Sequence, residues 1–152
     1  MKSAQWVQAA VLAVTSLGIL VALYSNNRQM NLLEKQMKAS FFADYTRRFH
    51  DIMQEFPPDI ASETFSYESL PEAERQEVLK NMKLYFDLCS EEYDLWENDM
   101  LEERVWRKWE AGISYSFSKK AYREAWEVCK QNSYYYEDFY NWVENDLLQQ
   151  AE

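Results

Sequence analysis

Hydrophobic and polar positions divide the chain into one uninterrupted apolar segment followed by several amphipathic ones. From Trp6 to Tyr24 the sequence reads WVQAAVLAVTSLGILVALY and contains no charged side chain. A helix of this length rises roughly 28 Å, at ~1.5 Å per residue, which is close to the hydrocarbon thickness of a bilayer. Trp6 and Tyr24 stand at its ends, where amphipathic rings favour the membrane interface. The pattern predicts a transmembrane helix over 6–24 after a short tail over 1–5.

Two other interpretations of this segment are a cleaved signal peptide and a buried helix of a soluble protein. Tyr24 stands where a cleavage site needs a small residue, and the apolar run is longer than a usual signal core. A buried helix of a soluble protein usually keeps a polar stripe, which 6–24 lacks. Gly18 and Ala22 lie four residues apart, and small residues at this spacing let two helices approach closely, so helix dimerisation is one possibility.

Apolar positions spaced three and four apart continue beyond the apolar segment. They are Met30, Leu33, Met37, Phe41, Tyr45, Phe49, Ile52 and Phe56. This spacing predicts a long amphipathic helix over 25–56, next to the membrane, which Pro57 and Pro58 end. Asn26 and Asn27 leave open whether this helix is continuous with the membrane helix. Turn-type residues predict a loop over 57–70.

Further helical patterns follow over 71–152. We expect helices that begin near Ser69, Ser118 and Ser133, with a capping box from Ser69 to Glu72. Asn98 and Asp99 should end the first of them. Only 2 glycines and 3 prolines occur in 152 residues, which favours long helices over sheets and turns. The predicted fold is all-α: one membrane helix followed by an irregular bundle of about five helices, in which 71–152 packs on 30–56.

Three groups of residues resemble a known family. They are YFDLCSEEY over 85–93, then Val105, Trp106, Trp109, Gly112 and Ile113, and finally Ala125 and Trp126. Over roughly residues 37 to 143 the chain resembles a family of small uncharacterised bacterial and phage proteins with one N-terminal membrane helix and a helical domain of unknown function. The resemblance implies an all-helical fold and no known activity. Many members have a glycine-containing turn before the Trp-rich helix, where this chain has ENDM over 97–100.

The charge distribution restricts partners and predicts an orientation. The net charge of −10 is opposite in sign to what backbone-led binding of DNA or RNA requires, so we expect no nucleic acid partner. Arg28, Lys35 and Lys38 follow the apolar segment, whereas Lys2 alone precedes it. Because basic residues favour the cytoplasmic side, we predict a single-pass protein with a cytoplasmic C-terminal domain. We expect Cys89 and Cys129 to be buried, reduced thiols.

No pattern in the sequence predicts catalysis, a cofactor or a bound metal. Asp87, Glu91, Glu92 and Asp94 form the densest acidic group, which we interpret as a solvated helix face; any buried member should pair with Arg104, Arg107 or Lys108. Di-metal carboxylate bundles need Glu-x-x-His pairs from two helices, and the chain has 1 His. That residue, His50, is interpreted as a surface or boundary histidine. The prediction is therefore a non-enzymatic protein.

The aromatic load is the remaining indication of function. Helical spacing places most of the Trp and Tyr residues in the core. Interfaces also favour Trp and Tyr, and the candidate partner contacts are Trp106, Trp109, Trp142, Tyr134 and Tyr136. The leading hypothesis is a membrane-tethered interaction module, held by the bilayer through 6–24 and bound to a second copy or to a membrane complex. One alternative is a membrane-anchored enzyme or a small-ligand or metal sensor that uses the Asp87–Asp94 helix. A third, suggested by the phage members of the family, is a factor in host–phage conflict.

Overall fold

The computed structural model describes residues 2–149. In this range all regular secondary structure is helical, and no strand occurs. The elements are α1 (Lys2–Gln54), η1 (Tyr67–Ser69), α2 (Glu72–Glu97), α3 (Glu103–Phe117), α4 (Lys120–Cys129), α5 (Glu137–Trp142) and η2 (Val143–Leu147). η1 is a short 3-10 helix and η2 a π-helical turn. The predicted all-α fold is confirmed. The chain divides into an N-terminal unit, Met1–Ser40, and a helical unit, Phe41–Glu152.

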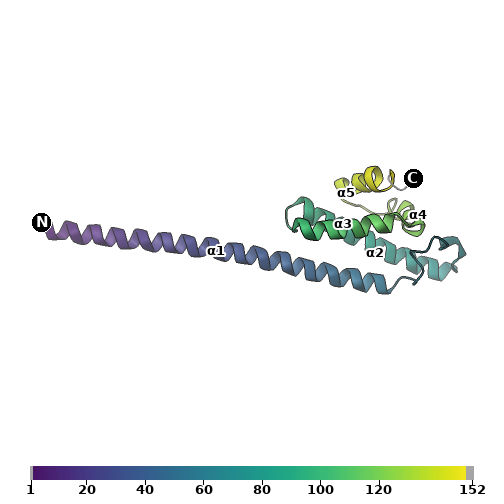
Figure 1. The fold of residues 1–152 in the computed structure, drawn as a ribbon, viewed down its shortest axis with the longest axis horizontal. Coiled ribbons are helices and arrows are strands. Elements are labelled where there is room, and N and C mark those ends of the chain that lie inside the picture. Colours follow the sequence, from purple (N-terminus) through teal and green to yellow (C-terminus); the bar gives the residue numbers. More distant parts are fainter. Residues whose placement is uncertain (1, 150–152) are drawn as a thin grey trace. The chain divides into compact units, whose positions relative to one another are not determined.

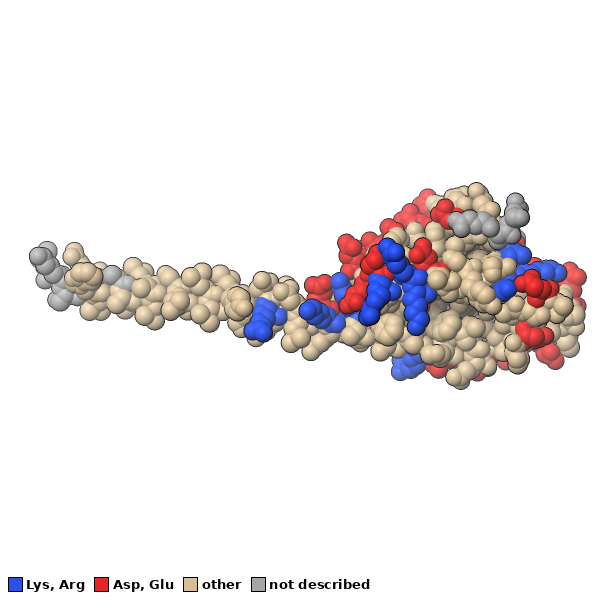
Figure 2. Space-filling model, in the orientation of Figure 1, with Lys and Arg blue, Asp and Glu red and all other residues tan. Residues whose placement is uncertain are grey.

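The N-terminal unit is α-helical throughout its described residues. The helical conformation passes through Asn26 and Asn27 without a break. From Gln5 onward this helix is long and apolar enough to cross a membrane, and none of its most apolar stretch is buried against protein. Figure 2 shows the uncharged surface along this stretch, before the first basic side chains. The predicted apolar helix is therefore present.

The helix α1 ends at Gln54, close to the predicted boundary. Two turn-type hydrogen bonds follow, from the Glu55 amide to the Ile52 carbonyl (3.1 Å) and from the Phe56 amide to the Met53 carbonyl (3.4 Å). Pro57 then stops the helix, because it has no amide hydrogen to donate.

In the helical unit, α2 contacts α3, α4 and α5 (Figure 1). Its apolar side chains recur three and four residues apart, so they share one face and form the centre of the core. Met82 and Phe86 are completely buried, and Tyr85 is 2% exposed. Fully burying side chains of this size stabilises a fold by about 1.5–3 kcal/mol each.

Aromatic rings fill most of this core. Phe86 meets Trp126 edge to face, with ring centroids 5.2 Å apart, and Trp96 stacks on Trp106 at 4.9 Å. The indole of Trp126 also donates a 2.7 Å hydrogen bond to the Glu144 carboxylate, which satisfies its only polar atom. Such ring contacts each contribute about 0.5–1.5 kcal/mol beyond the area that they bury.

The three predicted serine caps are wrong. Helix α2 follows Pro71, α4 follows Lys119 and α5 follows Tyr136, and none of these residues makes a side-chain cap. The hydroxyl of Ser69 instead donates to the Ser66 carbonyl (2.7 Å), and that of Ser118 to the Tyr115 carbonyl (2.6 Å). These serines close the preceding turns rather than opening the next helix.

The chain turns after α2 where the sequence predicted a break. Asp99 has a φ of 57°, in the left-handed region that glycine and asparagine or aspartate tolerate best. The Met100 amide donates to the Leu95 carbonyl at 2.9 Å, which closes the helix end. Asp99 thus takes the conformation that a glycine would adopt at this point.

Candidate functional site

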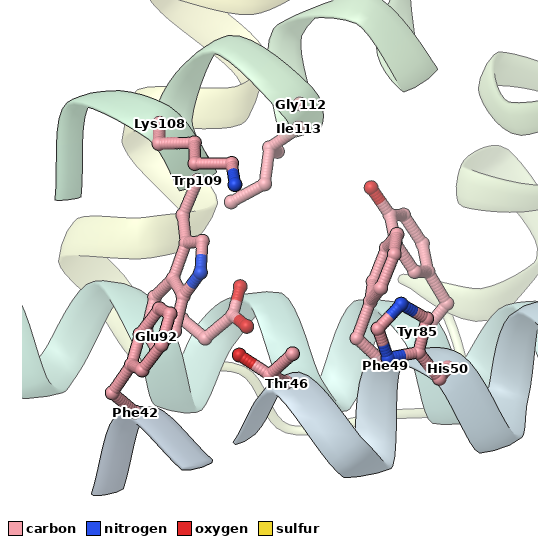
Figure 3. Close-up of a pocket in the computed structure, with 10 residues that line it drawn as sticks. All are labelled: Phe42, Thr46, Phe49, His50, Tyr85, Glu92, Lys108, Trp109, Gly112 and Ile113. Carbon is pink, nitrogen blue, oxygen red and sulfur yellow. The ribbon is translucent and has the colours of Figure 1, made fainter. Parts of the chain in front are cut away.

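Three helices of the helical unit surround a cavity of about 260 Å³ (Figure 3). Its apolar lining comes from Phe42, Phe49, Tyr85, Trp109, Gly112 and Ile113, and its polar lining from Thr46, His50, Glu92 and Lys108. On each of α1, α2 and α3 the contributing residues are spaced as neighbours on one helix face. Helical periodicity therefore brings three separate stretches of sequence to one site.

Two aromatic pairs stand on opposite sides of the cavity (Figure 3). On one side, Phe42 of α1 and Trp109 of α3 lie nearly parallel, with centroids 6.1 Å apart and planes 10° apart. On the other, Phe49 and Tyr85 lie 6.5 Å apart at 55°. The tyrosine hydroxyl points away from α1, where it donates to Ser116 at 2.9 Å. The space between the pairs is thus bounded largely by ring surfaces.

The carboxylate of Glu92 lies between these pairs and points into the cavity (Figure 3). The residue is only 5% exposed, and among the described residues no hydrogen bond or ion pair reaches its side chain. Burial raises the pKa of Glu92 to about 8; the Arg48 charge opposes this shift and the Glu91 charge adds to it. Near neutral pH this carboxyl group can therefore exist in either protonation state.

Two further polar side chains point into the same space. Figure 3 shows the Thr46 hydroxyl beside the carboxylate of Glu92 and the Lys108 ammonium across the cavity. His50 lines one side, where its ring packs edge to face on Phe49 at 5.8 Å. The cavity thus combines apolar walls with a hydroxyl, an imidazole, an ammonium and a buried carboxyl group, as binding sites for small molecules commonly do.

An ion pair next to Glu92 joins α1 to α2. The Arg48 guanidinium lies 2.5 Å from a carboxylate oxygen of Glu91, and the Tyr45 hydroxyl donates to the same oxygen at 3.2 Å. Arg48 also lies over the Tyr45 ring, 5.0 Å from its centroid. Burial, together with the neighbouring Glu91 charge, raises the pKa of Tyr45 to about 12. These contacts fix the part of α1 that lines the cavity.

The acidic group on α2 is divided among different environments. Asp87 pairs with Lys83 at 2.7 Å, one turn earlier on the same helix, and Asp94 accepts a hydrogen bond from Asn98 at 3.1 Å. These two residues fit the predicted solvated face. Glu92 does not fit it, because it is buried.

The expected cation partners of the acidic group are also wrong. The buried member of the group, Glu92, makes no ion pair with Arg104, Arg107 or Lys108 in the described residues, whereas Arg48 of α1 pairs with the partly exposed Glu91. Arg107 pairs with Glu103 at 2.9 Å instead.

The five predicted partner-contact aromatics lie in different surroundings. Trp106 is 3% exposed and is a core residue, the position that its helical spacing favoured over a partner contact. Trp142 is half-buried and packs 5.7 Å from it. Trp109 is half-buried in the cavity wall. Tyr134 and Tyr136 are exposed, at 107% and 54%.

The predicted anchor residues all lie exposed on the helix of the N-terminal unit. Trp6 and Tyr24, at the two ends of the apolar segment, are 76% and 70% exposed. Gly18 and Ala22 are exposed as well. A side chain added at Gly18 would meet nothing within 4 Å.

Other candidate chemistry is limited in the described residues. Cys89 and Cys129 are free and buried, as predicted, and burial raises the pKa of both thiols. In the described range, no group of three or more His, Cys, Asp or Glu side chains could hold a metal ion.

The cavity itself was not predicted from the sequence. A signal for Glu92 was nevertheless present, because it lies one turn after Cys89 and two turns after Tyr85 on the apolar side of α2. An acidic residue on a buried stripe is uncommon and marks a group to be examined for function.

The fold and the cavity define a small all-α protein with a candidate membrane helix and a solvent-accessible aromatic cavity into which a carboxyl group points. Comparisons with protein-family models, curated proteins and solved structures find no match to this chain. Membership of the family that the sequence resembles stays a prediction, and function is inferred from the residues themselves.

Proposed function

We propose that this protein is a non-enzymatic interaction module, tethered to a membrane by residues 6–24 and carrying its helical unit on the cytoplasmic side. The supporting observation is the exposed apolar surface of α1. Val14 and Leu20 are 72% and 63% exposed, on a stretch without a charged side chain. A continuous apolar surface of this kind requires cover by lipid or protein, and its length matches a bilayer.

The proposed orientation rests on the distribution of basic residues. Arg28, Lys35 and Lys38 follow the apolar segment within a few turns, and Lys2 precedes it. Lysine and arginine close to a membrane helix are retained on the cytoplasmic side. The helical unit is then cytoplasmic, an environment that keeps thiols such as Cys89 reduced.

Exposed tyrosines support a role in protein interaction. Tyr134 and Tyr136 precede α5 and Tyr140 lies within it, and the three are 107%, 54% and 37% exposed. Tyrosine is enriched at interfaces because it combines a large apolar ring with a hydrogen-bonding group. Tethering raises the effective concentration of this surface towards other membrane proteins, so the proposed partner is a second copy or a subunit of a membrane complex.

Membrane extraction tests the tether. We expect the full chain to remain in the pellet after an alkaline carbonate wash of isolated membranes. Substituting Val14→Lys together with Leu17→Lys should release it, because each central charge costs about 2.5–3.5 kcal/mol in insertion. The matched variant Met30→Lys with Leu33→Lys, outside the apolar segment, should stay in the pellet. Recovery of the wild-type chain in the carbonate supernatant would overturn the proposal.

Protease protection and cross-linking test the orientation and the interaction. Protease added to intact spheroplasts should leave the helical unit uncut until the cells are lysed. Cross-linking in membranes at native abundance should yield a defined adduct that weakens in Tyr134→Ala with Tyr136→Ala. Tyr115→Ala, at another site with 60% exposure, serves as the control. If the chain stays monomeric and free of adducts, the interaction role is excluded.

A further inference from the structure

The Glu92 side chain faces a cavity and has no hydrogen-bond or ion-pair partner among the described residues. Buried carboxylates in proteins are normally paired or hydrogen-bonded, since an unpaired buried charge is costly. Here the carboxylate is 5% exposed, faces about 260 Å³ of open space and receives no hydrogen bond from the described residues. Arg48, the nearest arginine on α1, is engaged with Glu91 instead. A ligand in the cavity would supply the missing donor.

We propose that this cavity binds a small organic ammonium ion with an apolar body, whose ammonium group contacts Glu92 while the apolar body lies between the two aromatic pairs. This site goes beyond the proposed tethering role and does not depend on it.

The ring surfaces favour a cationic ligand. Trp109 and Phe42 on one side, with Phe49 and Tyr85 on the other, present aromatic faces and edges to the cavity. An ammonium ion is attracted to the face of an aromatic ring, most strongly to tryptophan. A carboxylate that points into the same space adds a charge-assisted hydrogen bond, which is stronger than one between neutral groups. Both features recognise a donor that carries positive charge.

The size of the cavity limits the ligand. A cavity near 150 Å³ accommodates benzene, and sites for drug-sized ligands begin at about 300 Å³. At about 260 Å³ this cavity suits one ring with a short side chain, or a short branched chain. A metal ion is a poor alternative, because no group of three or more His, Cys, Asp or Glu side chains in the described residues could hold one.

Lys108 determines the orientation of the ligand in the cavity. Its ammonium group enters the cavity across from Glu92 (Figure 3), so the two sides of the site carry opposite charges once Glu92 is ionised. The cationic end of the ligand is therefore placed at Glu92, and any carbonyl or carboxylate that it carries is directed towards Lys108.

Binding of this kind is linked to pH. An ammonium ion favours the ionised form of Glu92, so the affinity should fall as the pH drops below the pKa of about 8 that burial gives this group. The ionisable groups around it are Arg48 and His50 on α1, Tyr85, Cys89 and Glu91 on α2, and Lys108 on α3.

Calorimetric titration of the full chain in neutral-detergent micelles tests the site. The probes are phenethylammonium and its neutral isostere 2-phenylethanol, each corrected for partition into empty micelles. We expect saturable binding of the ammonium probe and at least tenfold weaker binding of the alcohol. Glu92→Gln should lower the affinity for the ammonium probe at least tenfold. Glu77→Gln, the same change at an exposed position of α2, should leave it unchanged.

A cavity-filling variant locates the binding independently of charge. Thr46→Leu adds apolar volume beside Glu92 and should lower the affinity for both probes. Circular dichroism checks that the variant is folded. A third probe, n-butylammonium, reproduces a lysine side chain. Because it lacks a ring, we expect it to bind more weakly than phenethylammonium; equal affinity would overturn the role given to the aromatic walls. Equal affinities of amine and alcohol, or of wild type and Glu92→Gln, would overturn the proposal.

Discussion

The Arg48 guanidinium lies 2.5 Å from the Glu91 carboxylate and thereby joins α1 to α2, one residue away from the buried Glu92. Both side chains are partly exposed, at 37% and 40%. Solvent screens such pairs, and measured contributions of exposed ion pairs are about 0.2–1 kcal/mol. The Tyr45 hydroxyl, which donates to the same carboxylate, adds a second contact between the helices. We therefore interpret this group chiefly as a device that positions the α1 wall of the cavity.

A double-mutant cycle on Arg48→Ala and Glu91→Ala should give a coupling free energy of about 0.5–1 kcal/mol that shrinks as salt is added. Urea unfolding of the helical unit within the full chain, followed by near-ultraviolet circular dichroism, measures it. The exposed pair Arg107 and Glu103, within α3, provides a reference cycle of about 0.3–0.5 kcal/mol. A coupling near zero would mean that Tyr45 and apolar contacts alone hold α1 against α2.

The stability of the helical unit should decrease as the pH rises from about 5 to 8. The pKa of Glu92 is about 8 in the folded protein, against 4.5 for an ordinary glutamate. Between these values the folded state holds a proton that the unfolded state has released, so the free energy of unfolding falls by up to ~1.4 kcal/mol per pH unit. This contribution is fully present below pH 4.5 and lost above pH 8. Urea unfolding at several pH values measures it.

The substitution Glu92→Gln tests whether Glu92 causes this pH dependence of stability. The amide keeps the shape of the protonated carboxyl group and does not ionise, so the variant should lack this slope and exceed the wild type in stability at pH 8. The control Glu77→Gln should keep the pH dependence of the wild type. The same pH dependence in wild type and Glu92→Gln would show that the pKa of Glu92 is not raised.

The aromatic and apolar periodicity of the sequence predicted most of the fold. The stripe on α2 that includes Met82, Tyr85 and Phe86 is buried as expected, because three- and four-residue spacing places these side chains on one face whatever the neighbours are. The ends of the helices were predicted less well. Ser69 and Ser118 can bond to a carbonyl behind them or to an amide ahead of them, and tertiary packing decides between the two.

The cavity could not be predicted from the residue pattern of any single helix. Phe42, Glu92 and Trp109 come from three helices, and their approach depends on how those helices cross. The sequence distinguishes a buried acid from a solvated one only through its place on the helix, and Glu92 lies at the edge between the apolar stripe and the acidic face. Its burial follows from the α1 and α3 residues packed over it, which helical periodicity alone does not specify.

Trp106→Ala should destabilise the helical unit by about 3–5 kcal/mol. The indole is 3% exposed and stacks on Trp96 at 4.9 Å, so truncation leaves a cavity that its neighbours fill only partly. Tyr134→Ala removes an exposed ring and should change stability by less than about 0.5 kcal/mol. Urea unfolding of both variants tests the assignment of Trp106 to the core. Similar small effects in both would place Trp106 at the surface, where it could contact a partner.

Gly112→Ala should stabilise the helical unit by about 0.5–1 kcal/mol. Gly112 lies inside α3, its φ is not positive, and a Cβ added there would meet no atom within 4 Å. Alanine then reduces the entropy of the unfolded chain without strain in the folded one. Gly18→Ala serves as a control, because Gly18 is equally open but lies in the N-terminal unit, outside the transition being measured. A shift of the urea midpoint to higher concentration in Gly112→Ala alone is the expected result. A lower midpoint would mean that another group lies close to position 112 in the folded protein and clashes with the added methyl group.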